Sequence, residues 1–404
     1  MLERCRPFAD VLLGLLLVLL VDLAAFHQGL YFRWLRPDSY SGRVEESSRR
    51  FAAMRRQNPL RRVVMMSNST GGSCLAEKVL EDELQAAGWP LAAINLSSGG
   101  SSARAWYFLL GHEQVQRETT ALVVLGVHYR GLVHTDGQID LQTIKTRLDP
   151  LDLLVLPTSF PEAELRFKAS TAVFFRSPLF GEDLRDFLAD PAERRAKLTK
   201  ARKAEERFEK GWRRAILSRE NVTQARLGAD GQIDRASLSA PVRDNAELVA
   251  ELESQLQRQA RGQNAATPME IAPEQAYMLR RSVRLLAGRG IPVVVALMPH
   301  SPFPPPGPTC APLETLVKDL AAEGLPVRFF RDAAMLSQVE SPTYFRDPLH
   351  VNATGAELYT RALAGYLAAA FESSELKIDE RRGVVRGEQN RRPDQAGDAE
   401  GPQE

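Results

Sequence analysis

The sequence predicts an α/β protein built on a parallel β-sheet with helices on both faces. Short apolar runs alternate along the chain with stretches of helical periodicity, and this alternation is typical of a parallel sheet. The runs are continuously apolar rather than alternating apolar and polar, as expected of strands that are buried on both faces. The five predicted strands are Arg62–Met66, Leu91–Leu96, Ala121–Gly126, Ile291–Met298 and Pro326–Phe330.

The composition is that of a globular protein and excludes a collagen-like or mostly disordered chain. Of the 404 residues, 44% are hydrophobic and 25% are charged, and the formal net charge is only +1. A nearly neutral chain has no overall field that attracts nucleic acid, so no nucleic-acid partner is predicted. The 3 cysteines are too few for a disulfide framework or a zinc site. No group of His, Asp and Glu has metal-ligand spacing, so we predict neither a metal nor another cofactor.

The first element is an apolar run over residues 8–26, interrupted only by Asp10 and Asp22. As a helix this run reaches about 28 Å, close to the bilayer core of about 30 Å. We therefore expect a transmembrane signal anchor that carries the rest of the protein out of the cytoplasm, into the periplasm. The alternative is a cleaved export signal, in which Arg4 and Arg6 form the charged region.

Helical patterns lie between the strands, and each of three is followed by a glycine suited to a left-handed C-cap. These helices are Cys74–Ala87 before Gly88, Pro273–Ala287 before Gly288, and Ala311–Glu323 before Gly324. A last helix is predicted over Ala356–Phe371.

Residues 183–270 break the alternation, and we expect a helical insertion there. Two apolar stripes recur at intervals of four residues and would dock it. They are Ala204, Phe208, Trp212 and Ile216, followed by Leu248, Leu252 and Leu256. The basic stretch Glu193–Arg214 is interpreted as a solvated helix face, the alternative being contact with an anionic lipid or polysaccharide.

The expected organisation has five parts, one of which contains an insertion. They are a cytoplasmic N-terminus (1–7), a transmembrane signal anchor (8–26), a juxtamembrane linker (27–60), an α/β domain (61–372) containing the helical insertion (183–270), and a disordered tail (373–404).

A polar, glycine-containing segment directly follows the first strand. It reads Ser67-Asn68-Ser69-Thr70-Gly71-Gly72-Ser73 and leads into a helix. Ligand sites of parallel sheets lie at the carboxyl ends of the strands. Hydroxyls and backbone N–H groups at such a position stabilise developing negative charge.

A second segment, near the end of the chain, complements the first. Asp347 and His350 lie three residues apart on a turn that contains a proline, ahead of the last helix. A serine nucleophile needs a base that takes its proton, and the base needs a carboxylate that fixes its tautomer. A hydroxyl after the first strand and an Asp-x-x-His before the last helix would supply all three groups.

On these residues the sequence resembles the SGNH (GDSL-type) hydrolase superfamily, and within it the membrane-anchored, extracytoplasmic members that serve polysaccharide O-acetylation, of the alginate acetylation type. The resemblance covers roughly residues 61–182 and 273–372. It implies a three-layer α/β/α domain in which Ser67-Asn68-Ser69 replaces the family's Gly-Asp-Ser, with Ser69 as the nucleophile. The closing Asp-x-x-His-x-Asn-x-x-Gly matches Asp347, His350, Asn352 and Gly355. Asp347 would then orient His350, the base.

The resemblance also implies an oxyanion hole and its substrate contacts. Gly99 or Gly100 would donate a backbone N–H after the second strand, beside Asn68 in the nucleophile block. Where the family carries the asparagine of Gly-x-Asn-Asp after the third strand, this chain has His128. The loss of one oxyanion donor typically slows a reaction about 100- to 1000-fold. His300, after the fourth strand, is interpreted as a structural histidine, the alternative being that it lines the pocket.

The resemblance implies an enzyme that acts on O-acyl groups, above all O-acetyl groups, of a cell-envelope polysaccharide. A sugar hydroxyl would resolve the acyl-enzyme in a transferase and water in an esterase, and a multi-pass membrane protein would supply the acyl group. Two alternatives stay open. The departures at Ser67-Asn68 and His128 favour a catalytically degenerate module that binds glycan or scaffolds envelope assembly, and the basic insertion favours a protein of the lipid surface.

Overall fold

The computed structural model describes most of the chain. The described residues are 2–31, 35–57, 60–112, 115–128, 132, 137–209, 225–238, 240–244, 246–261, 271–300, 310–340, 344–345 and 349–376.

The predicted α/β class and parallel sheet are confirmed. The strands are β1 (Arg62–Met66), β2 (Ala92–Asn95), β3 (Thr120–Val127), β4 (Val293–Leu297) and β5 (Val327–Phe330). All of them pair in parallel, in the order β2-β1-β3-β4-β5. Each predicted apolar run forms a strand because its residues are buried from both sides, β1 and β3 along their whole length.

The strand order creates a switch point between β1 and β3. The chain leaves β1 for β2 on one side and then returns to β3 on the other. In open parallel sheets, the crevice at the carboxyl ends of the two strands flanking this reversal is where ligands bind. The predicted nucleophile segment follows β1 directly, so the topology places it at this crevice.

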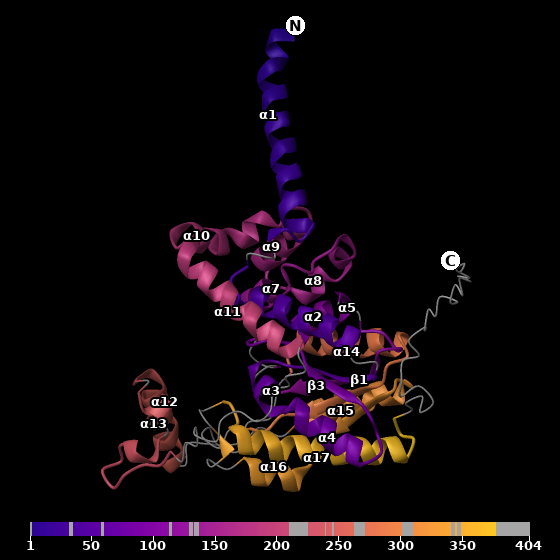
Figure 1. Ribbon diagram of the computed structural model, residues 1–404, viewed down its shortest axis with the longest axis vertical. Coiled ribbons are helices and arrows are strands. Elements are labelled where there is room, and N and C mark those ends of the chain that lie inside the picture. The colour runs from indigo at the N-terminus through magenta and orange to yellow at the C-terminus, as the bar shows by residue number, and fades with distance from the viewer. Residues whose placement is uncertain are drawn as a thin grey trace, which may run out of the picture.

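Helices cover both faces of the sheet, in three layers (Figure 1). One face carries α2 (Tyr40–Gln57), α5 (Ala103–His112), α14 (Pro273–Gly288) and α15 (Ala311–Ala322). The other carries α4 (Glu77–Ala86), α16 (Ala333–Val339) and α17 (Ala353–Glu372). Successive strand residues alternate between these layers, so Val64 packs into the first core and Val63 into the second.

Two of the three predicted glycine caps are confirmed. Gly88 and Gly324 have φ values of +87° and +81°, the left-handed conformation that glycine adopts without strain. Gly288 instead lies inside α14, and Gly290, with φ +69°, takes the left-handed position two residues later. The helix predicted over Cys74–Ala87 is α4, which begins three residues later than predicted and follows a separate short helix, α3 (Ser69–Cys74).

The structure differs from the expected linker over residues 27–60. Most of this segment forms α2, whose Val44, Phe51 and Met54 are buried in the first core. These apolar residues are separated by arginines and serines, so the stretch looked polar, but a helix brings them onto one face.

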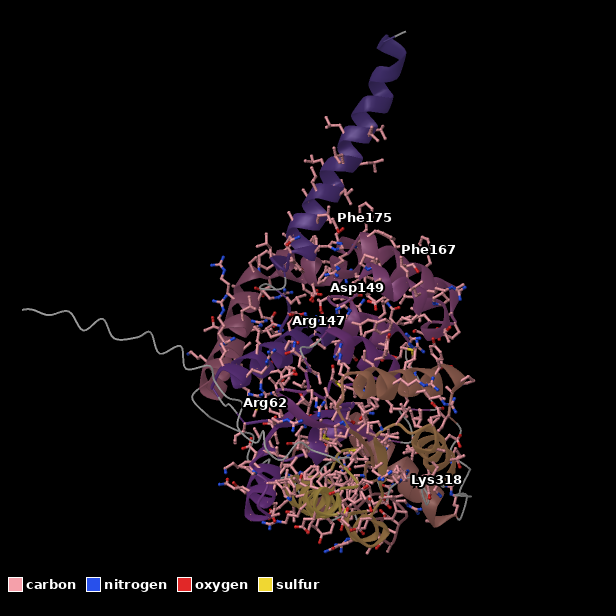
Figure 2. The ribbon with its side chains drawn as sticks, turned by 90° about the vertical axis from the view of Figure 1, so that its right-hand side faces the viewer. Arg62, Arg147, Asp149, Phe167, Phe175 and Lys318 are labelled. Carbon is pink, nitrogen blue, oxygen red and sulfur yellow. The ribbon has the colours of Figure 1, made fainter. Side chains whose placement is uncertain are left out.

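A group of helices from residues 137–209, here called the helical cap, packs onto α2 (Figure 1). Its α-helices are α7 (Gly137–Ile144), α8 (Leu156–Ser159), α9 (Ala163–Phe174), α10 (Gly181–Ala189) and α11 (Pro191–Glu209), with the 3₁₀ helices η3 (Pro150–Leu154) and η4 (Ser177–Phe180). Figure 2 shows Arg147 of the cap between α1 and Arg62 of β1. Arg147 donates to Ser48 of α2 at 2.8 Å and pairs with Glu45 at 3.1 Å, which ties the cap to the α/β layers.

The structure does not support the predicted transmembrane helix over residues 8–26. Among the residues whose side chains it describes, no helix is both long and apolar enough to cross a membrane. The helix α1 (Leu2–Asp22) projects from the body, and the π-helix η1 (Leu23–His27) follows it. Asp22 is buried and its carboxylate accepts the amides of Arg176 and Ser177 at 3.1 and 2.7 Å, so the end of the apolar run docks on the helical cap.

Only part of the predicted insertion is described. It includes α11, the 3₁₀ helix η5 (Arg235–Ser237), α12 (Ala240–Arg243) and α13 (Ala246–Ala260). The side chains of the first stripe and of Leu248 lie outside the description, as does the tail beyond residue 376. Of the second stripe, Leu252 is fully buried and Leu256 packs at the edge of the same apolar cluster, as expected.

Candidate active site

The structure brings together two predicted site residues from opposite ends of the domain. The imidazole Nε2 of His350 lies 3.0 Å from Ser69 Oγ, although 281 positions separate them in sequence. Both side chains are half-buried. This is the hydrogen-bond distance that a nucleophile and a base would require. In the tautomer with its proton on Nδ1, Nε2 accepts from the serine hydroxyl.

A buried serine anchors the end of β1 and so fixes where Ser69 begins α3. Ser67 Oγ donates to the carbonyl of Gly126 on β3 at 2.6 Å, across the switch point. A Cβ on Gly71 would lie only 2.1 Å from Ser67 Oγ, so only glycine fits there. Ser67 therefore has a structural role, because its hydroxyl joins the carboxyl end of β1 to β3.

Asn68 has a capping role that the sequence did not indicate. It is the N-cap of α3, and its Oδ1 accepts the amide of Thr70 at 3.0 Å. Asparagine is among the preferred residues for this position, because its oxygen satisfies an N–H that the helix leaves open. Asn68 therefore sits at the predicted site beside Ser69, with its side-chain oxygen turned to the backbone.

The Asn-x-x-Gly segment holds the loop that presents His350. Asn352 caps α17: its Oδ1 accepts the amide of Gly355 at 3.0 Å, and its own amide donates to the carbonyl of Tyr344 at 2.7 Å. A Cβ on Gly355 would lie 2.6 Å from that same carbonyl oxygen. An antiparallel bridge between Phe345 and Val351 closes the loop. Asp347, the predicted partner of His350, lies outside the described residues.

The loop after β2 places Gly99 beside Ser69. From the position that a Cβ of Gly99 would occupy, Ser69 Cβ is 3.8 Å away. The loop is tied to β1, since the amide of Ser98 and the hydroxyl of Ser101 both donate to the Ser67 carbonyl, at 2.9 and 3.2 Å. Gly100 has φ +72°, a conformation that favours glycine.

The amides of Ser69 and Gly99 are available to a substrate. Neither donates to another residue within the described part of the chain. Two N–H groups beside a nucleophile can bind a developing oxyanion. Of the two predicted glycines, only Gly99 lies next to Ser69. Gly100 lies against Ile139 and Tyr40.

His128 lies at the carboxyl end of β3, as predicted, but it is 3% exposed and faces another histidine. Its ring stacks on that of His300, with the centroids 6.0 Å apart and the planes at 16°. The amide of His300 donates to Glu340 Oε1 at 2.9 Å. Burial raises the pKa of the Glu340 carboxyl above its ordinary value, against the opposing effect of this hydrogen bond.

Arg43 is a site residue that sequence reasoning missed. Its Nη1 lies 3.3 Å from the position that a Cβ of Gly99 would occupy. Arg43 belongs to α2, which lay in the expected linker, and no motif marks it. The only sequence signal was the arginine content of residues 27–60.

One group of described residues has ligand atoms close enough together for a metal ion, away from the two predicted segments. It consists of His112, Asp149 and Asp152, whose ligand atoms lie within 4.8 Å of one another. Both carboxylates already serve as caps of η3, since Asp149 accepts the amides of Leu151 and Asp152, and Asp152 accepts that of Asp149. These hydrogen bonds explain why the two carboxylates lie close together, and His112 is partly exposed beside them.

Comparisons with known proteins give no family for this chain: no protein-family model matches it, and no curated protein matches it.

Proposed function

We propose that the protein is an SGNH-type serine enzyme that transfers or hydrolyses O-acyl groups of a carbohydrate. The observation that carries the proposal is the 3.0 Å approach of His350 Nε2 to Ser69 Oγ at the switch point of a parallel sheet. Gly99 lies beside Ser69, and the N–H groups of these two residues would support acyl chemistry.

In the first half of the reaction, Ser69 Oγ attacks the carbonyl carbon of the ester as its proton passes to His350 Nε2. The tetrahedral intermediate carries its negative charge on the former carbonyl oxygen, which the two amides stabilise. The bond to the leaving alcohol then breaks, and His350 returns the proton to that alcohol. The product is an acyl ester on Ser69.

In the second half, an acceptor hydroxyl gives its proton to His350 and attacks the acyl-serine. The bond between the acyl carbon and Ser69 Oγ breaks, and the proton returns to Ser69. Water as the acceptor gives an esterase, and a sugar hydroxyl gives a transferase. Asp347, three residues before His350, is the proposed acceptor for the Nδ1 proton, in keeping with the order of the sequence motif.

The cell-envelope polysaccharide, an acyl-donor protein and the extracytoplasmic location are part of the same proposal and rest on the resemblance of the sequence. A second candidate is a glycan-binding module without activity. One observation favours it: His128, at the position where the superfamily carries an asparagine that donates to the oxyanion, is buried against His300.

The experiment is active-site labelling of the full-length protein with a fluorophosphonate probe, with the modified residue mapped by mass spectrometry. We expect the label on Ser69 and its loss in Ser69→Ala and His350→Ala. Ser73→Ala is the matched control, because Ser73 lies on the same helix but donates its hydroxyl to the carbonyl of Thr70. Hydrolysis of p-nitrophenyl acetate should fall at least about 1000-fold in the two site variants and not in the control.

Two results would contradict the proposal. Folded protein that takes no label favours the binding module, as does label that persists in His350→Ala at the rate of the unchanged protein. Circular dichroism of each variant separates loss of chemistry from loss of fold.

A further inference from the structure

The large apolar side chains that are exposed among the described residues all lie within residues 11–30 or 151–188. The first range is α1 and its foot, and the second belongs to the helical cap. Within the described part of the chain, none lies on the α/β layers. On the cap these residues, here called the apolar cap surface, are Leu151, Leu154, Phe167, Phe174, Leu184 and Leu188.

The apolar cap surface comes from three helices, η3, α9 and α10, that belong to one group. Each helix carries two of the six residues, at spacings of three, seven and four positions, respectively, and residues at these spacings share one face of a helix. η3 packs against α9, and η4 contacts both α9 and α10. The exposed fraction reaches 83% at Leu154 and 72% at Phe167. Single exposed apolar residues are ordinary, whereas a cluster of them marks a contact with a partner or a membrane.

The helix α1 is apolar on all its sides over residues 11–21. Val11, Leu12 and Leu13 are 63%, 69% and 66% exposed, and the apolar residues of the following two turns are exposed as well. Successive residues of a helix point about 100° apart, so these side chains face every direction. A helix that is hydrophobic all round is buried in a large core or in a membrane. A second copy of the chain would cover one side of α1 and leave the others in water, whereas lipid covers all of them.

The foot of α1 is fixed to the cap by two separate contacts. The buried carboxylate of Asp22 accepts the amides of Arg176 and Ser177, at 3.1 and 2.7 Å. The ring of Phe26 packs against that of Phe180, with the centroids 5.1 Å apart. Any apolar phase that surrounds α1 therefore meets the cap at a defined place.

The exposed apolar part of α1 ends where the cap begins, since Val21 directly precedes Asp22. Figure 2 shows Phe167 and Phe175 at the end of the body from which α1 projects. The described apolar part, Val11–Val21, is about 16 Å long at about 1.5 Å per residue, which is about half of a bilayer core of about 30 Å. It can therefore lie within one leaflet, and the cap is then at the boundary between lipid and water.

Charge does not account for this surface. Residues 151–190 contain more acidic than basic side chains, so they do not attract anionic headgroups. Lys168, beside Phe167, is already paired with Glu164 at 2.6 Å. The affinity of this end of the molecule for lipid would come from the burial of apolar area, which salt does not screen.

We infer that the helical cap rests on a lipid bilayer, with the apolar cap surface at the boundary between headgroups and acyl chains and the apolar part of α1 within the facing leaflet. The inference does not need α1 to cross the bilayer, and it is independent of the reaction proposed for Ser69. The helix α3, which begins at Ser69, lies beyond α2 from α9 and α10 (Figure 1). The candidate active site therefore stands in water, away from the bilayer by the thickness of the cap.

The test measures the depth of nitroxide labels on full-length protein bound to vesicles of phosphatidylcholine. The labels are placed by Leu154→Cys and Phe167→Cys in a Cys5→Ser background, since the other two cysteines are buried. On vesicle binding we expect their collisions with a water-soluble nickel chelate to fall at least about threefold and those with oxygen to rise, because apolar faces at the interface lie about 5–10 Å deep.

The matched control is the label placed by Lys318→Cys. Lys318 is exposed on α15, and Figure 2 shows it at the opposite end of the body from α1. Its collisions with the nickel chelate should not change on vesicle binding. The double variant Leu154→Ser with Phe167→Ser should bind the vesicles at least about tenfold more weakly than Lys318→Ser, because two large apolar side chains lose their burial. Vesicle binding of the unchanged protein should be the same at about 10 mM and about 300 mM salt.

Three results would overturn the inference. In the first, the labels at positions 154 and 167 stay as accessible to the nickel chelate as the label at position 318 in vesicle-bound protein. In the second, they become shielded from both reagents and broadened by a neighbouring nitroxide, which means that a second copy covers the cap. In the third, binding needs anionic lipid and is lost at high salt, which means that basic residues make the contact instead.

Discussion

Thr360 on α17 holds Cys74 at the end of α3. The Thr360 hydroxyl donates to the Cys74 carbonyl at 3.1 Å and accepts the amide of Ala76 at 3.0 Å. These two backbone groups lie at the break between α3 and α4. One side chain on the last helix therefore stabilises the turn that follows α3, and it joins the helix that begins at Ser69 to the helix that follows the His350 loop.

Thr360→Val should destabilise the protein by about 2 kcal/mol. The substitution keeps the shape of the side chain but leaves a buried carbonyl and a buried amide without their partner, and each such group costs about 1–3 kcal/mol. Urea denaturation measures the change. Thr199→Val is the control, because Thr199 is exposed on α11 and should shift the free energy of unfolding by less than about 0.5 kcal/mol. Equal effects of the two variants would refute the role given to Thr360.

Gly355→Ala should reduce labelling of Ser69 in protein that still folds. The added methyl would meet the Tyr344 carbonyl at 2.6 Å, so the loop before α17 has to move and His350 moves with it. We expect a loss of about 1–3 kcal/mol in stability and at least about a tenfold slower reaction with a fluorophosphonate.

Gly365→Ala is the matched control for that variant. Gly365 lies on the same helix, and a Cβ there would meet nothing within 4 Å. The change should stabilise α17 by about 0.5–1 kcal/mol and leave the rate of labelling unchanged. Unchanged labelling in Gly355→Ala would show that the glycine does not position the base.

Glu340→Gln should make the protein more stable at neutral pH and no more stable in acid. Burial raises the pKa of this carboxyl in the folded state, so the folded protein binds the proton more tightly than the unfolded chain does. The stability of the unchanged protein therefore falls as the pH rises from the ordinary pKa of 4.5 through the raised one.

The amide of the variant keeps an acceptor for His300 but has no charge to bury. Urea denaturation of both proteins between about pH 4 and pH 8 measures the difference in free energy of unfolding, which should grow with pH. A difference that does not change with pH, or that shrinks as the pH rises, would count against the buried carboxylate.

Asp22→Asn should destabilise the docking of the N-terminal segment by about 2 kcal/mol. Asp22 accepts two amides of the helical cap and lies 3.3 Å from His27 Nε2, and bonds to a charged acceptor are worth about 1.5–3 kcal/mol each. Thermal unfolding and limited proteolysis near residue 27 measure the effect. Asp82→Asn, in an exposed pair with Lys78, should change neither. Proteolysis that is equally slow in both variants would refute this docking role.

The strands could be predicted from sequence because a strand buried on both faces has to be continuously apolar. The pairing of Ser69 with His350 was predicted from the resemblance of the two segments to a known family, since the local pattern alone does not distinguish Ser69 from the serines beside it. The capping contacts of Asn68 were not predictable, since the same residue type fits a substrate contact. Their assignment needed the backbone.

Arg43 and Asp22 were missed for a different reason. Both lie in segments whose composition suggested an extended linker and a membrane anchor. Their roles come from contacts with residues far along the chain, Gly99 for one and Ser177 for the other. The composition of a segment does not show which distant residues the fold will place beside it, and the roles of Arg43 and Asp22 depend on those residues.

The distance in sequence between Ser69 and His350 also has a consequence for biosynthesis. The serine leaves the ribosome early, but His350 arrives only just before the last helix of the domain. If the two residues act as proposed, the Ser69 hydroxyl stays an ordinary alcohol until α17 docks and His350 comes beside it. On that proposal a nascent or truncated chain is chemically silent, and labelling of Ser69 reports that synthesis of the domain has finished.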